Sequence, residues 1–300
     1  MRVRIPDKDT ARVLRGRVWR GARCPAMCGV VCALAMAAGC GGASRPSAVV
    51  LFLDGAGHFT AGGNVRNGLR SAGYDGRFQG YVWTSFLGWG TDHLLVAGSG
   101  LKAQGLADRI VRLRRDDPEG EIHVMGLSAG TAVIVNALER LPEGTDVDTV
   151  VLFSSSVYAN RDLTPALQHV RRALYATCSP HDLILSSLVI TADGETGSPA
   201  GRTGFRIPPS VPKSRRSEYA KVVNLPWMPN YAAYGWNGGH VAATRAEFVK
   251  HVIAPRVLSP GPFPLDRPML IFEDTGTTQT AATSWNTAMA CSTSSADTSR

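Results

Sequence analysis

The feature that most constrains this chain is the pentapeptide Gly126-Leu127-Ser128-Ala129-Gly130, which lies between two runs of different character. The apolar run 122–125 before it predicts a strand, and the run 131–141 after it predicts a helix. A serine flanked by glycines two residues away, at a strand-to-helix turn, indicates a sharp turn with a strained serine backbone. The serine hydroxyl then stands at a helix N-terminus, where developing negative charge is stabilised.

Strand-like and helix-like segments alternate along the chain. Strands are predicted over 48–53, 78–85, 121–127, 148–154, 173–177 and 221–225. Helices are predicted over 64–72, 101–115, 129–141, 163–172, 183–190 and 245–257. This alternation predicts an α/β fold with a mostly parallel central sheet and helices on both faces. In such sheets a functional site lies beyond the carboxyl ends of the strands.

A serine hydroxyl is a poor nucleophile unless a histidine, oriented by a carboxylate, takes its proton. Asp182 follows the predicted strand 173–177, and His240 follows the last predicted strand, just before the final helix. The order serine, acid, histidine is the one expected for a turn of this kind. Asp162, one strand earlier, and Asp193, in a looser segment, are the alternatives for the acid.

From these residues and the strand–helix rhythm, the segment 48–257 resembles the α/β-hydrolase superfamily. The resemblance implies an α/β-hydrolase fold in which Ser128 is the nucleophile, Asp182 the acid and His240 the base. It also implies an oxyanion hole made by the backbone N–H groups of Ala56 and Ala129. The sequence departs from the superfamily at Asp54, where histidine is common.

The resemblance further implies a serine hydrolase, esterase- or lipase-like, that cleaves a carboxylic ester through an acyl-enzyme. It implies a small-molecule or lipid ester as substrate, and neither a metal nor an organic cofactor. An amidase, peptidase, thioesterase or acyltransferase on the same scaffold stays open, because these enzymes share the same catalytic residues and differ in their substrates. A non-catalytic, hydrolase-like binding lipoprotein is the alternative from a different class.

The formal net charge of the whole chain is +8. The first 39 residues carry eight basic and two acidic side chains, so the remaining residues are together nearly neutral. No nucleic-acid partner is therefore expected. A basic region followed by the apolar run 24–40 predicts a signal peptide over 1–39. Ala37-Ala38-Gly39-Cys40 resembles the bacterial lipobox, although alanine stands where leucine is preferred. This implies an exported protein anchored in the cell envelope through lipid on Cys40; ordinary secretion and an uncleaved anchor are the alternatives.

The remaining expectations concern the flanks and loops of the predicted hydrolase domain 48–273. Residues 40–47 are expected to form a tether, and the Ser/Thr-rich residues 274–300 a disordered tail. The Gly-rich, apolar loop 87–100 is a candidate lid, and His58 a candidate pocket residue. Cys178 either pairs with Cys291 or is a small buried hydrophobe, and the cysteines show no zinc-binding spacing.

Overall fold

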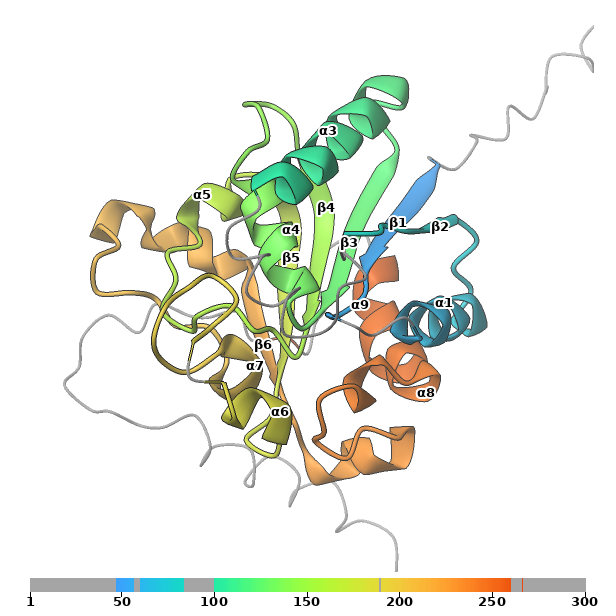
Figure 1. Ribbon diagram of the computed structural model, residues 1–300. Coiled ribbons are helices and arrows are strands. Elements are labelled where there is room, and N and C mark those ends of the chain that lie inside the picture. Colours follow the sequence, from blue (N-terminus) through green and yellow to red (C-terminus); the bar gives the residue numbers. More distant parts are fainter. Residues whose placement is uncertain (1–46, 57–59, 84–99, 189, 260–265, 267–300) are drawn as a thin grey trace, which may run out of the picture. The chain divides into compact units, whose positions relative to one another are not determined.

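The computed structural model describes residues 47–56, 60–83, 100–188, 190–259 and 266. Within these ranges the chain forms one parallel sheet with helices on both faces (Figure 1). This arrangement confirms the predicted fold class. No helix in these ranges combines the length and the apolar character needed to cross a membrane.

The sheet has six strands in the order β2-β1-β3-β4-β5-β6, and each neighbouring pair is parallel. Their bounds are β1 Ala48–Leu53, β2 Arg77–Gly80, β3 Glu121–Leu127, β4 Val147–Phe153, β5 Val170–Cys178 and β6 Val222–Pro226. β3 lies between β1 and β4, so Leu127 pairs with Phe153 where β3 and β4 end. The carboxyl ends of these strands therefore lie along one edge of the sheet.

Successive side chains of the buried strands enter two different hydrophobic cores, as the period of two in a β-strand requires. In β1, Val49, Leu51 and Leu53 belong to one core, and Val50 and Phe52 belong to the other. Burial on both faces explains why β1, β3 and β4 are mostly apolar rather than alternating.

The longer helices divide between the two faces (Figure 1). α3 (Gly100–Asp116) and α4 (Gly130–Leu138) cover one face, together with the short helices α5 (Thr164–Leu167) and α7 (Ala200–Thr203). α1 (Ala61–Ser71), α8 (Ala246–Phe248) and α9 (Ala254–Leu258) cover the other. The short helix α6 (Leu183–Ser186) follows β5, and 3-10 helices span Lys213–Lys221, Pro229–Tyr234 and Ala242–Thr244.

The helix predicted over 163–172 is wrong in its second half. The helix ends at Leu167, and β5 begins at Val170, which pairs with Val147 of β4 and is buried. The backbone N–H of Val147 also donates to the His169 carbonyl at 2.9 Å. Pairing with a buried neighbouring strand overrides the weak local helix propensity of this segment.

Three other boundaries differ from prediction. The strand predicted over 78–85 is β2, which ends at Gly80, and its last two predicted residues lie outside the described ranges. The helix predicted over 183–190 is the single turn of α6. The final helix is interrupted by a π-helical turn, Val249–Ile253, before Pro255. Proline has no N–H to donate within a helix, which accounts for the local change in its hydrogen bonding.

Several predictions fall on residues outside the described ranges. They are the signal peptide 1–39, the lipidation site Cys40, most of the tether 40–47, the pocket residue His58 and the tail 274–300. The candidate lid 87–100 also lies there, except for Gly100, which begins α3.

Candidate active site

Ser128 occupies the sharp turn that the sequence predicts between β3 and α4. Its φ is 53°, in the left-handed region that a residue other than glycine rarely adopts. A Cβ on Gly126 would lie 2.7 Å from Ile134 Cδ1, and one on Gly130 would lie 2.7 Å from the Asp54 carbonyl oxygen. Gly130 therefore has no room for a side chain, because the clash is with backbone, whereas a Cβ at Gly126 would require the end of the Ile134 side chain to move. This local arrangement is a nucleophile elbow at the carboxyl end of a central strand.

Asp182 and His240 are 58 residues apart in sequence and form a hydrogen bond in the structure. His240 Nδ1 lies 2.8 Å from Asp182 Oδ2. The carboxylate is 1 % exposed and the imidazole 8 % exposed. An ionised carboxylate only accepts, so this hydrogen bond requires a proton on Nδ1, and in a neutral imidazole Nε2 is then the acceptor. This is the tautomer that a general base needs.

The Asp182 carboxylate binds both His240 and the N-terminus of α6, the helix that follows Asp182. Asp182 is the N-cap of α6, and its Oδ1 accepts a hydrogen bond from the Leu185 N–H at 3.0 Å. Its other oxygen accepts from His240. The cap fixes the side chain in the orientation that presents Oδ2 to the imidazole.

The end of β4 connects the serine to the histidine. The Ser128 N–H donates to the Phe153 carbonyl at 2.9 Å. The next residue, Ser154, donates its hydroxyl to the His240 carbonyl at 2.7 Å. The main chain at Ser128 and the main chain at His240 are therefore both bonded to adjacent residues at the end of β4. No hydrogen bond between the Ser128 hydroxyl and the His240 ring is present among the described residues. In unliganded hydrolases this contact is often long and tightens with substrate.

The predicted oxyanion-hole residues belong to the loop after β1 and to the residue that follows the serine. A Cβ on Gly55 would lie 3.4 Å from Ser128 Cβ, so the loop after β1 passes directly against the elbow. Ala56, next in that loop, is buried, and so is Ala129, at the N-terminus of α4. The Asp54 carbonyl accepts from Trp83 Nε1 at 2.7 Å, which fixes the start of this loop.

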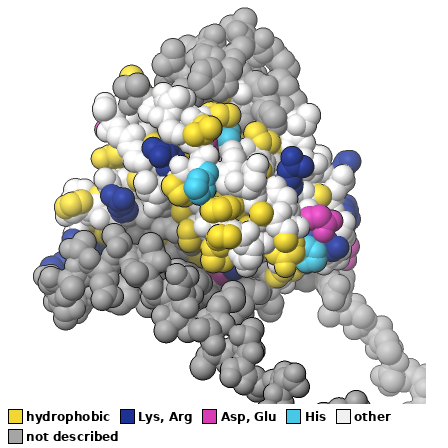
Figure 2. All heavy atoms as spheres, turned by 90° about the horizontal axis from the view of Figure 1, so that it is seen from below, with side chains coloured by type: hydrophobic (Ala, Val, Ile, Leu, Met, Phe, Trp, Pro, Cys, Tyr) yellow, Lys and Arg dark blue, Asp and Glu magenta, His cyan; other side chains and the backbone are white. Residues whose placement is uncertain are grey.

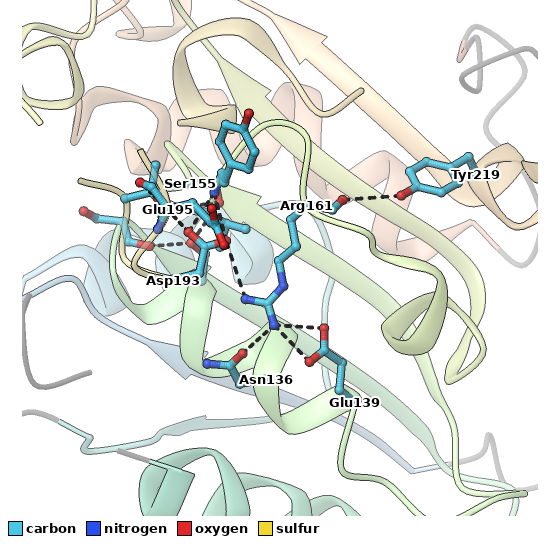
Figure 3. A network of polar contacts seen from close by, with 12 residues as sticks. Asn136, Glu139, Ser155, Arg161, Asp193, Glu195 and Tyr219 are labelled. Carbon is cyan, nitrogen blue, oxygen red and sulfur yellow. Dashed lines mark hydrogen bonds and ion pairs between the residues drawn. The ribbon is translucent and has the colours of Figure 1, made fainter. Parts of the chain in front are cut away.

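The two alternative acids bind elsewhere. Asp162 accepts from the backbone N–H and the hydroxyl of Thr164, at the start of α5. Asp193 accepts from the Tyr158 N–H and the Thr191 hydroxyl, and it lies 3.6 Å from Arg161. Figure 3 shows Asp193 within this polar network, which Arg161 extends to Asn136 and Glu139. Neither carboxylate contacts His240.

Other chemically active side chains near the strand ends have structural surroundings. Burial raises the pKa of the Cys178 thiol to about 12, so this free cysteine is a protonated, small apolar residue and no rival nucleophile. His181 is exposed and packs edge-on against Trp227, with 4.7 Å between the ring centroids. Trp83 and Trp236 are buried core residues rather than an exposed pocket wall. The described residues contain no cluster of side chains able to hold a metal ion.

A hollow of about 440 Å³ opens beside His240. Its lining residues are Asn64, Ile184, Gly239, His240, Val241, Ala242 and Arg245. Ile184 and its neighbour Leu183 are the exposed hydrophobic residues of α6, at 43 % and 79 % exposure. Figure 2, viewed from below Figure 1, shows hydrophobic side chains gathered around histidine on this face. The hollow therefore has a mixed lining, in which Ile184, Val241 and Ala242 are the apolar side chains.

Neither the protein-family models nor the curated proteins include a match to this chain. Several solved structures are similar at low identity. A cutinase-like protein from Cryptococcus sp. is 17 % identical, with a TM-score of 0.38, covering 72 % of this chain and 97 % of that one. Dienelactone hydrolase from Anabaena variabilis is 16 % identical, with a TM-score of 0.40 and coverages of 72 % and 87 %. A poly(3-hydroxybutyrate) depolymerase from Bordetella parapertussis is 12 % identical, with a TM-score of 0.41 and coverages of 71 % and 78 %.

Similarity at this level identifies neither a family nor a substrate. The α/β-hydrolase fold is evident from the chain itself: a parallel sheet covered on both faces, with a serine elbow after a central strand.

Proposed function

We propose that the protein is a serine hydrolase that cleaves a carboxylic ester through an acyl-enzyme on Ser128. The observation that carries this proposal is the buried 2.8 Å hydrogen bond between His240 and Asp182. It occurs at the same sheet edge as a serine whose backbone is held at a φ of 53°. An oriented imidazole and a serine held in a sharp turn are what acyl transfer requires.

In this mechanism the Ser128 oxygen forms a bond to the ester carbonyl carbon while its proton moves to His240 Nε2. The Ala56 and Ala129 N–H groups stabilise the negative charge that develops on the carbonyl oxygen, each by about 3 kcal/mol in the transition state. The carbon–oxygen bond to the alcohol then breaks, and the alcohol leaves with the proton from His240. A water molecule then attacks the acyl carbon while His240 takes its proton. The bond to the Ser128 oxygen breaks, the acid leaves, and His240 returns the proton to the serine.

Asp182 keeps the imidazole in the required tautomer and stabilises it when it becomes charged. Its near-complete burial strengthens this interaction, because little water competes for the carboxylate. The hollow beside His240, bordered by Ile184, suits an ester with an apolar portion.

The decisive experiment is labelling with a fluorophosphonate probe together with turnover of p-nitrophenyl esters. We expect labelling and turnover in the wild type and neither in Ser128→Ala. Ser187→Ala is the matched control, because Ser187 is exposed and its hydroxyl bonds only the Ile184 carbonyl. Labelling of Ser128→Ala equal to that of the wild type would refute the proposal.

The bond cleaved is tested separately with matched ester, thioester and anilide substrates that carry the same acyl group. We expect the ester to have the highest kcat/KM. A higher value for the anilide would instead identify an amidase or peptidase. Acyl transfer to an added alcohol in preference to water would identify an acyltransferase.

We further propose that the protein is exported and anchored to a membrane through lipid on Cys40. The basic region, the apolar run and the small residues before Cys40 support this proposal. Cys40→Ser is expected to accumulate as an unprocessed precursor, whereas normal processing of that variant would indicate ordinary secretion.

A further inference from the structure

We infer that Ser154 is a positioning residue that sets the main-chain position of His240. This inference rests on the proposed function, because it concerns the same imidazole. Ser154 follows β4, is 3 % exposed and donates its hydroxyl to the His240 carbonyl at 2.7 Å. It contacts the backbone of the histidine, whereas Asp182 contacts its ring.

The backbone at Ser154 is strained in the same sense as that of the nucleophile. Its φ is 43°, and among the described residues only Ser128 and Ser154 combine a positive φ with a side chain. The Ser154 N–H donates to the Thr177 hydroxyl at 2.9 Å, which ties this turn to β5. Strain of this kind persists only where the surrounding structure enforces it, and it is concentrated at functional sites.

The histidine loop needs such an anchor. Gly238, at φ +88°, and Gly239 immediately precede His240, and glycine is the residue with the greatest conformational freedom. A Cβ on Gly238 would lie 2.9 Å from Ser179 Oγ, so the loop is also closely packed. The imidazole is held at its ring by Asp182 and at its backbone by Ser154. Two points of attachment define the direction of Nε2 more closely than one.

Ser154 also couples the histidine to the nucleophile. The carbonyl just before it, that of Phe153, accepts from the Ser128 N–H at 2.9 Å. Adjacent residues of one strand end thus hold the main chains of the elbow and of the histidine loop. Removing the Ser154 hydroxyl should leave the elbow intact and widen the range of positions open to His240, and so reduce the fraction of productive geometries.

The test compares two substitutions that remove the same hydroxyl and differ in backbone strain. Ser154→Ala keeps a Cβ at φ 43°, and Ser154→Gly relieves that strain. We expect kcat per active site, titrated with the fluorophosphonate, to fall about tenfold in both variants. KM and the pH midpoint of kcat/KM should stay at wild-type values, because substrate contacts and the Asp182–His240 pair are untouched. The glycine variant should have the higher Tm.

Ser156→Ala is the matched control, because Ser156 is buried two residues away and its hydroxyl has no hydrogen-bond partner among the described residues. Its kcat should equal that of the wild type. The inference is overturned if Ser154→Gly keeps kcat within twofold of the wild type, or if Ser156→Ala loses as much as Ser154→Ala. Failure of the proposed function has a different signature: Ser128→Ala would then retain the turnover of the wild type.

Discussion

Replacing Asp182 by asparagine separates the chemical role of this residue from its structural one. The carboxylate forms two hydrogen bonds, one from the Leu185 N–H through Oδ1 and one from His240 through Oδ2. An asparagine retains an oxygen for the helix cap, where it serves as well as aspartate. It presents an N–H₂ group to the imidazole, and this group donates instead of accepting.

The magnitude of the expected loss follows from that change. Facing a donor at 2.8 Å, His240 Nδ1 must become the acceptor, so the ring proton moves to Nε2. In that tautomer the imidazole cannot take the proton of Ser128. The corresponding substitution in serine proteases lowers kcat about 10⁴-fold, equivalent to about 5 kcal/mol of transition-state stabilisation. We expect a loss of similar size here, because the side chain of Asp182 is only 1 % exposed and water cannot replace it.

The assay is hydrolysis of p-nitrophenyl butyrate by the wild type, Asp182→Asn and Asp162→Asn, with Tm measured for each. Asp182→Asn should lose nearly all activity at nearly unchanged Tm, because the cap to Leu185 is kept. Asp162→Asn should keep its activity, because Asp162 binds Thr164 at the start of α5. Activity of Asp182→Asn within tenfold of the wild type would refute the assignment of this residue as the acid. Loss in Asp162→Asn alone would transfer the role to Asp162.

Three further outcomes are expected. Gly130→Ala would place a Cβ 2.7 Å from the Asp54 carbonyl, so thermal unfolding should show about 1–3 kcal/mol of destabilisation, with a lower kcat as the oxyanion loop is displaced; an unchanged Tm and kcat would contradict this. Arg161→Ala removes paired contacts of 2.9 Å to Glu139 and should cost about 2–3 kcal/mol in urea unfolding, while kcat per folded molecule stays constant. A variant whose only cysteine is Cys178 should react with a thiol reagent only when unfolded. The raised pKa of its thiol contributes stability that is complete below the ordinary value of 9.0 and is lost as pH rises toward about 12.

The elbow could be predicted from sequence because its determinants are local. Glycine on both sides of Ser128, a strand before and a helix after are all encoded within about 20 residues. The same holds for the alternation that predicts a parallel sheet, since burial on both faces makes a strand uniformly apolar. Local signals failed at residues 168–172, where pairing between Val170 and Val147, far apart in the chain, replaced the predicted helix by the start of β5.

The sequence favours Asp182 as the acid but leaves Asp162 and Asp193 open as alternatives. Asp162, Asp182 and Asp193 all follow sheet strands in the order that a hydrolase requires. The structure separates them by their partners: Asp162 binds Thr164 at the start of α5, Asp193 binds Tyr158 near Arg161, and Asp182 contacts His240. Partner choice depends on which loop a strand end faces, and that is a property of the folded sheet.

Ser154 illustrates the same division. As one of three consecutive serines it has no pattern that distinguishes it from its neighbours. Only the folded chain brings its hydroxyl to the carbonyl of a residue 86 positions away. Sequence alone determined the nucleophilic turn and the kind of sheet, because short-range sterics and burial govern both. Tertiary structure decided which carboxylate and which hydroxyl hold the imidazole, because hydrogen bonds act over about 3 Å and their partners meet only when distant strand ends are packed together.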